Sequence, residues 1–123
     1  PENGIVTMSV QEQGYRTAMR VFSRPKSEWP DGIYIGDDLM THGVLAALQK
    51  LELRVGRDVQ IATHSNRGSN VLMGYEDDLI MVEQDPMEVV QALFDLLEPL
   101  LDGRKPPENE ILIKPRLRLN NSD

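Results

Sequence analysis

Two adjacent carboxylates, Asp37 and Asp38, follow an apolar run and a glycine in the stretch YIGDDLMTHG at residues 34–43. Such a pair can hold a divalent metal ion, act in catalysis, or accept hydrogen bonds from a neutral ligand. A metal site needs several oxygen ligands around one ion, and a phospho-accepting receiver needs a further acid at the end of another strand and a lysine nearby. The next predicted strand is followed by His-Ser-Asn (residues 64–66), which supplies neither. We therefore expect no metal and no cofactor here, and a binding site rather than an active site.

The rest of the sequence offers little for other kinds of chemistry. It contains no Ser-His-Asp set, no Gly-rich phosphate loop and no histidine pair with metal spacing. The chain has no cysteine, which excludes disulfides and thiolate metal sites and fits a reducing compartment such as the cytoplasm. A net charge of −7 disfavours nucleic-acid binding by these 123 residues themselves, and the apolar runs are too short to cross a membrane.

The elements that must position the carboxylates alternate between strands and helices. The patterns predict strands at 4–8, 32–36, 59–63 and 79–82, helices that begin after Ser9, at Asp37 or Asp38, and at Pro86, and an extended piece at 111–119. Ser9 and Glu12 have the spacing of a capping box, and Asp85 before Pro86 is a typical helix start. This order predicts an α/β fold with three layers, in which a parallel sheet carries helices on both faces.

In a parallel sheet, ligands collect outside the carboxyl ends of the strands. Those ends are predicted to carry Ser9, then Asp37 and Asp38, then residues 64–67, and then Gln84. The convergence predicts a binding site, although polar residues in such places are also ordinary caps and turns. Of the two carboxylates, we expect Asp38 to cap the helix and Asp37 to face the ligand.

Two long stretches carry a resemblance to a known family. They are PDGIYIGDDLMTHGVLAALQKLELRVGRDVQIATHSN (residues 30–66) and LIMVEQDPMEVVQALFDLLEPLLDGRKPPENEILIKPRLRL (residues 79–119). The acid pair that opens a helix with Met40 and Gly43, the segment LELRVGRDV before the next strand, and Gln84 ahead of the final helix all match. In these features the chain resembles the effector-binding part of LacI/GalR-type transcription regulators.

The resemblance implies a type I periplasmic-binding-protein-like module, in which two α/β lobes close on a small molecule. Residues 1–84 would form the C-terminal lobe, residues 85–103 a helix of the other lobe, and residues 104–123 a return segment with the C-terminal tail. The implied function is effector sensing in a cytoplasmic, homodimeric DNA-binding regulator, whose helix-turn-helix head and first lobe would lie outside this chain. The alternatives are a periplasmic sugar-binding protein of a transporter and, from another class, an Asp-dependent magnesium phosphatase or receiver domain.

The resemblance also implies particular ligand contacts. Gln84 matches a glutamine near the ligand where the chain crosses between lobes, and Asp37 takes the first place of the family's Asn-Asp pair. His64, Ser65 and Asn66 replace a segment that in many members holds an aromatic residue and two aspartates. A hydroxyl grips sugar hydroxyls less strongly than a carboxylate does. The expected partner is therefore a small-molecule effector, for which a carbohydrate is one candidate but a plain hexose is disfavoured.

The last helix has an unusual composition. Apolar residues occupy most of its circumference between Pro86 and Asp102, far more than a surface helix needs. At roughly 25 cal/mol per Å², leaving them in water would forgo stabilisation comparable with that of a whole domain. We therefore expect this helix to be buried against another surface. In a protein of these 123 residues, that surface would belong to a second copy of the chain.

Overall fold

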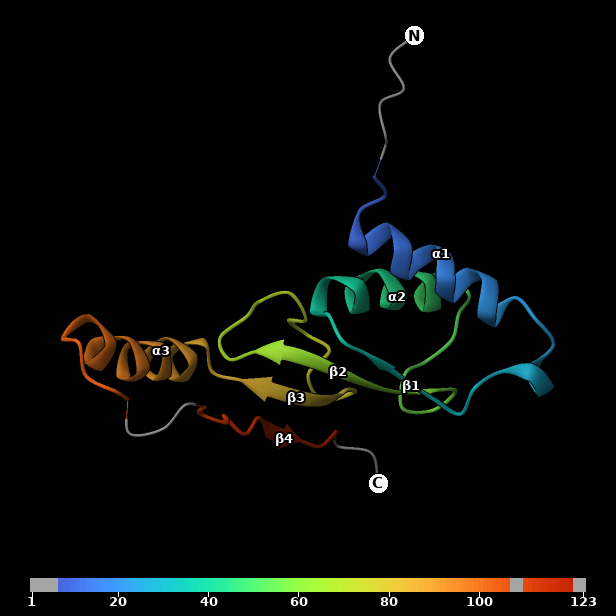
Figure 1. Cartoon of the computed structure of the whole chain (residues 1–123). Coiled ribbons are helices and arrows are strands. Elements are labelled where there is room, and N and C mark those ends of the chain that lie inside the picture. Colours follow the sequence, from blue (N-terminus) through green and yellow to red (C-terminus); the bar gives the residue numbers. More distant parts are fainter. Residues whose placement is uncertain (1–6, 107–109, 121–123) are drawn as a thin grey trace, which may run out of the picture.

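The computed structural model describes residues 7–106 and 110–120 (Figure 1). The elements in order are α1 (Val10–Phe22), the 3-10 helix η1 (Lys26–Glu28), β1 (Gly32–Ile35), α2 (Asp38–Lys50), β2 (Gln60–Asn66), β3 (Ile80–Gln84), α3 (Pro86–Leu101) and β4 (Arg116–Arg118). The expected strand at 4–8 lies mostly outside the described residues, and Thr7 and Met8 form no strand. The other predicted helices and strands are present.

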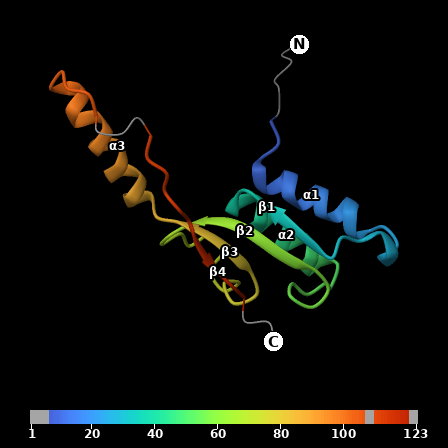
Figure 2. The ribbon, with the colours of Figure 1, turned by 60° about the horizontal axis from the view of Figure 1, so that its bottom comes forward.

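The strands form one sheet in the order β1-β2-β3-β4. β1 pairs with β2 and β2 with β3 in parallel, which confirms the α/β class. β4, which lies in the expected extended piece at 111–119, pairs with β3 antiparallel, so the sheet is mixed at this edge. The physical reason is the connection: after α3 the chain returns as an extended segment, without the second crossover helix that would bring it back parallel (Figure 2).

The helices are arranged differently from the expected three layers. α2 covers one face of the sheet, and α1 packs against α2 rather than against the opposite face (Figure 1). On that opposite face Tyr34 is 65% exposed, and its neighbours across the strands, Ala62 and Ile80, are half-buried. Within residues 7–106 and 110–120, helices therefore cover one face of the sheet only.

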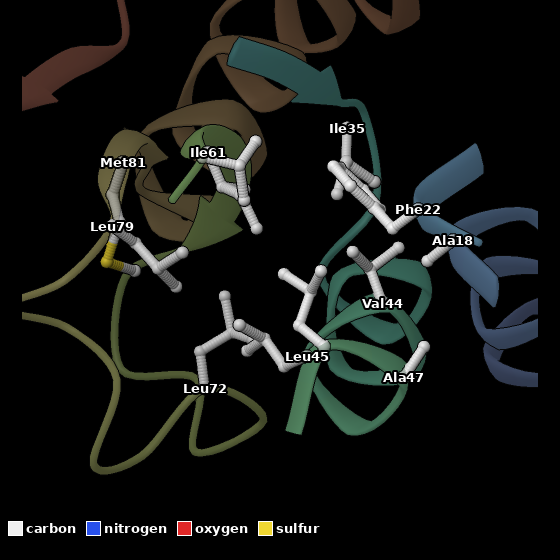
Figure 3. Packing of buried hydrophobic residues seen from close by; sticks show 12 residues of the cluster. Ala18, Phe22, Ile35, Val44, Leu45, Ala47, Ile61, Leu72, Leu79 and Met81 are labelled. Carbon is white, nitrogen blue, oxygen red and sulfur yellow. The ribbon is translucent and has the colours of Figure 1, made fainter. Parts of the chain in front are cut away.

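One hydrophobic core joins α1, α2 and the covered face of the sheet (Figure 3). Its largest fully buried apolar side chains are Leu48, Ile61, Leu79 and Val59. Alternation in β2 places Ile61, Thr63 and Ser65 on the buried side, as expected for a strand with one covered face. The core fixes the register of the strands, and with it the positions of the side chains at their ends.

The turn between α2 and β2 has a local ion pair. Arg57 Nη2 lies 2.8 Å from Asp58 Oδ2, and the backbone N–H of Arg54 donates to the same oxygen at 2.7 Å. These hydrogen bonds, that of Arg57 first, hold the pKa of Asp58 below its usual value. The pair organises a surface turn at the end of the sheet opposite to Asp37.

Two glycines allow α1 and α2 to approach closely. A Cβ atom at Gly43 would overlap the backbone carbonyl oxygen of Gln11, and one at Gly14 would overlap that of Met40. Because both obstacles are backbone atoms, a side-chain rotation cannot relieve the clash. The helix pair therefore depends on the absence of side chains at these two positions.

We expect Gly43→Ala to lower the free energy of unfolding by roughly 2 to 3 kcal/mol, because the helices must separate to admit the methyl group. Urea denaturation monitored by circular dichroism measures the change. His42→Ala, at the exposed neighbouring position of the same helix, is the matched control and should change stability by under about 0.5 kcal/mol. Equal stability of the Gly43→Ala variant and the unsubstituted chain would contradict the close approach.

Candidate functional site

The carboxyl ends of β1, β2 and β3 lie side by side. Ile35 of β1 pairs with Thr63 of β2, and Asn66 of β2 pairs with Gln84 of β3. β2 continues to Asn66, three residues beyond its predicted end, because pairing with β3 supports it as far as Gln84. His64, Ser65 and Asn66 are therefore strand residues, and alternate side chains point to opposite faces.

Asp37 is the N-cap of α2. Its backbone is extended (φ −144°, ψ 131°), and its carboxylate accepts a hydrogen bond from the backbone N–H of Met40 at 2.9 Å. Asp38 is the first helical residue. The prediction that Asp38 caps the helix was therefore wrong: β1 ends at Ile35, Gly36 turns the chain, and Asp37 is the last residue outside the helix.

Asp38 has a different role, in that it anchors a loop. Its Oδ2 accepts a hydrogen bond from the hydroxyl of Ser69 at 3.1 Å, and the Ser69 hydroxyl accepts one from the backbone N–H of Val71 at 3.3 Å. Gly68, with φ +83°, turns the chain immediately before this contact. Sequence reasoning missed Ser69, since nothing local indicates a partner 31 residues away. The contact holds the connection between β2 and β3 against the start of α2.

His64 and Gln84 are brought together as the sequence predicted. His64 Nε2 lies 3.3 Å from Gln84 Oε1, and both residues are half-buried. With the glutamine oxygen as acceptor, Nε2 carries the proton. The amide nitrogen of Gln84 and the other ring nitrogen of His64 then offer hydrogen-bonding capacity to a ligand.

The side chains of Ser65 and Asn66 point to opposite faces of the sheet, because neighbouring residues of a strand alternate. Ser65 is 3% exposed, and its hydroxyl donates to the backbone oxygen of Asn66 at 3.5 Å. Asn66 is exposed, and its backbone oxygen also accepts from the N–H of Ser69 at 2.9 Å. Of these two predicted contact residues, Asn66 presents its side chain at the surface and Ser65 belongs to the covered side.

Arg67 joins β2 to the start of α3. Its backbone N–H donates to the carbonyl oxygen of Gln84 at 2.7 Å, and its Nη1 lies 3.3 Å from Asp85 Oδ2. Asp85 Oδ1 accepts from the backbone N–H of Met87 and so caps α3, as predicted. The Arg67–Asp85 pair therefore connects the end of β2 to the start of α3, where the chain leaves the sheet.

Two buried hydroxyls lie beneath this edge. The hydroxyl oxygens of Thr41 and Thr63 are 2.7 Å apart, and both residues are fully buried. The Thr41 hydroxyl also donates to the backbone oxygen of Asp37 at 2.9 Å. The pair ties the start of α2 to the end of β2, and sequence reasoning missed it because a buried threonine on an apolar face has no distinct local signal.

The remaining observations limit the chemistry of the edge. Ser9 caps α1 and its hydroxyl accepts from the backbone N–H of Glu12. An apolar cavity of about 280 Å³ lies between α1 and β1, away from His64 and Gln84. In the described ranges, acidic and histidine side chains form no group able to hold a metal ion, and no helix is long and apolar enough to span a membrane. The edge carries uncharged groups (His64, Asn66, Gln84), carboxylates and the guanidinium of Arg67, which is paired with Asp85.

Comparison with known proteins places the chain in a family. Residues 2–122 match the family described as "periplasmic binding protein-like domain". The HTH-type transcriptional repressor PurR of Escherichia coli is 29% identical over 120 residues, which are 95% of this chain and 33% of the repressor. The chain therefore spans about a third of the length of the curated relatives that it matches.

Solved structures show the same fold. A regulatory protein of the LacI family from Chloroflexus aggregans aligns with a TM-score of 0.80 and 24% identity, over 95% of this chain and 41% of that protein. A dimeric Lac repressor with an 11-residue C-terminal deletion gives a TM-score of 0.74 and 21% identity, over 93% of this chain and 40% of the repressor. The chain therefore belongs to the periplasmic-binding-protein-like domain family, as the resemblance noted from the sequence implied, and the relatives named here are transcription regulators.

Proposed function

We propose that the chain senses a small-molecule effector for a cytoplasmic LacI/GalR-type transcription regulator and catalyses no reaction. The observation that carries the proposal is the His64–Gln84 contact at the carboxyl edge of the sheet, beside the exposed amide of Asn66. Imidazole and amide groups both donate and accept hydrogen bonds without a net charge. They suit a neutral ligand with several hydroxyl, carbonyl or amine groups.

The proposed lobes follow the boundaries expected from the sequence. Residues 1–84 would form the C-terminal lobe, and residues 85–103 would form a helix of the other lobe. Residues 104–123 would be the segment that returns to the C-terminal lobe, together with the C-terminal tail. The position of α3 supports this division, since it projects from the sheet and contains no buried residue (Figures 1 and 2). The edge that carries His64 and Gln84 would then face the other lobe, and the effector would lie between them.

DNA binding is assigned to a separate domain of the complete protein. The net charge of −7 on these residues opposes binding to a phosphate backbone. The relative PurR is described as an HTH-type repressor and is about three times as long as the matched segment. A homodimer is the expected assembly, in keeping with the dimeric Lac repressor among the solved structures.

The periplasmic sugar-binding protein of a transporter is the second candidate. It would share the fold and the location of the ligand. The relatives named in the preceding section are transcription regulators, and this favours the first candidate. The resemblance aligns Ser65 with an aspartate that grips sugars in many members, but Ser65 is turned to the covered side of the sheet, which does not favour a hexose.

Substitutions at Asp37 separate its capping role from a ligand contact. Asp37→Ala should lower the free energy of unfolding by about 1 kcal/mol because a helix cap is lost, whereas Asp37→Ser keeps a capping oxygen and should remain near the unsubstituted stability. Asp77→Ala, which removes an exposed carboxylate from the connection between β2 and β3, is the control for charge. If Asp37 also contacts the effector, the serine variant binds it more weakly despite normal stability. Unchanged effector binding by Asp37→Ser would restrict Asp37 to the cap.

Gln84→Ala in the complete protein should weaken effector binding by about 1 to 3 kcal/mol, because a polar group of the ligand loses its partner. A thermal-shift screen of carbohydrates and nucleobases first identifies a ligand, and isothermal titration calorimetry then compares the variants. Glu83→Ala on the same strand is the matched control, since Glu83 lies near Arg118 of β4. Equal affinities of Gln84→Ala and the unsubstituted protein would remove Gln84 from the site.

A further inference from the structure

The start of α2 is held to the sheet by a pair of hydroxyl groups inside an otherwise apolar core. The hydroxyl oxygens of Thr41 and Thr63 lie 2.7 Å apart, and both residues are 0% exposed. Fully buried side chains of the same two elements include Leu48 and Ile61, which are apolar. In the part of the chain that the structure describes, this is the only hydrogen bond between α2 and β2. A polar pair in such a place needs a reason, because burying polar groups costs free energy.

Each of the two hydroxyls has another acceptor within reach. The Thr41 hydroxyl donates to the backbone oxygen of Asp37, four residues earlier, at 2.9 Å. This is the ordinary way in which a helical threonine satisfies its O–H. The Thr63 hydroxyl lies 3.2 Å from the backbone oxygen of His64, its neighbour in β2. Satisfying the two hydroxyls therefore does not require Thr41 and Thr63 to meet.

The distances indicate a directed chain of two hydrogen bonds. Because Thr41 donates its single hydroxyl proton to Asp37, Thr63 must be the donor in the 2.7 Å contact. That distance is the usual one between two oxygens, whereas the 3.2 Å to His64 is longer than usual. The chain runs from β2 through Thr41 to the backbone of Asp37, whose carboxylate caps α2 at Met40.

Apolar packing and hydrogen bonding constrain the position of α2 differently. The hydrophobic effect holds the helix on the sheet but has no preferred direction. A hydrogen bond does have one, and a shift of α2 by about 1 Å would break the contact between the two hydroxyls. The start of α2 carries Asp37 and Asp38, and Asp38 accepts from Ser69 of the loop after β2. The position of the helix therefore decides where both carboxylates lie relative to the strand ends.

We propose that Thr41 and Thr63 are positioning residues of the effector site, an assignment that rests on the function proposed above. Their hydrogen bond fixes the start of α2 against β2, and so places Asp37 and Asp38, while it adds little to stability. Neither threonine reaches a ligand itself, since both are fully buried. Replacing both partners of a buried hydrogen bond by apolar groups of the same shape is nearly neutral or stabilising. Position and stability can therefore be separated by experiment.

Two double variants of the complete protein separate them. Thr41→Val with Thr63→Val keeps the shape and removes both hydroxyls, so the urea midpoint should be equal or higher. Thr41→Ser with Thr63→Ser keeps both hydroxyls and removes two buried methyl groups, so the urea midpoint should fall. Thr17→Val, at an exposed position of α1, is the control and should leave the midpoint unchanged.

Hydrogen-deuterium exchange without any ligand then reports the position of α2. The backbone amides of residues 40–43 should exchange about tenfold faster in the valine variant, because the start of the helix is no longer fixed. In the serine variant and in Thr17→Val they should exchange at the unsubstituted rate. The expected order of protection is thus the reverse of the order of stability. Exchange that follows stability, faster in the serine variant than in the valine variant, would overturn the positioning role.

Effector binding is the second measurement, made with a compound that the thermal-shift screen of carbohydrates and nucleobases identifies. The valine variant should bind it about tenfold more weakly, and the serine variant as tightly as the unsubstituted protein. Equal affinity of the valine variant, when Gln84→Ala does weaken binding, would overturn the proposal for the two threonines alone. Equal affinity of both the valine variant and Gln84→Ala would overturn the proposed effector site itself.

Discussion

Parallel pairing of β1, β2 and β3 is the constraint on which the candidate site depends. It sets the ends of three strands side by side, so that Asp37, His64 and Gln84, far apart in sequence, share one edge. The register is held by the core beneath, where Ile61 and Leu79 are fully buried. A slip of one residue would turn His64 into the core and Thr63 out of it. The contacts that stabilise the sheet therefore also fix the geometry of the site.

Local sequence signals predicted most of the fold. Ser9 and Asp85 cap the helices that they were expected to cap, and the apolar periodicity located α1, α2 and α3. The cap was expected at Asp38 rather than Asp37 because either of two adjacent aspartates can cap a helix. The choice depended on where β1 stops and Gly36 turns, and such boundaries are the least certain part of a sequence pattern.

What the sequence could not supply were contacts between distant segments. The Asp38–Ser69 hydrogen bond and the Thr41–Thr63 pair join residues 31 and 22 positions apart. Neither has a motif, since serine and threonine make hydrogen bonds in many settings. Likewise, the antiparallel pairing of β4 follows from the path of the chain after α3, which no local propensity records. The family resemblance predicted where a ligand would bind, but it did not predict these supporting contacts.

The most direct test of the account is hydrogen-deuterium exchange of the complete protein with and without its effector. An effector held at the carboxyl edge should slow exchange at the backbone amides of residues 37–41, 64–69 and 84–87, because it restrains the ends of β2 and β3 and the starts of α2 and α3. The amides of the turn at 54–58, at the opposite end of the sheet, should exchange as before. Protection confined to that turn, or to the cavity between α1 and β1, would contradict the assignment of the site.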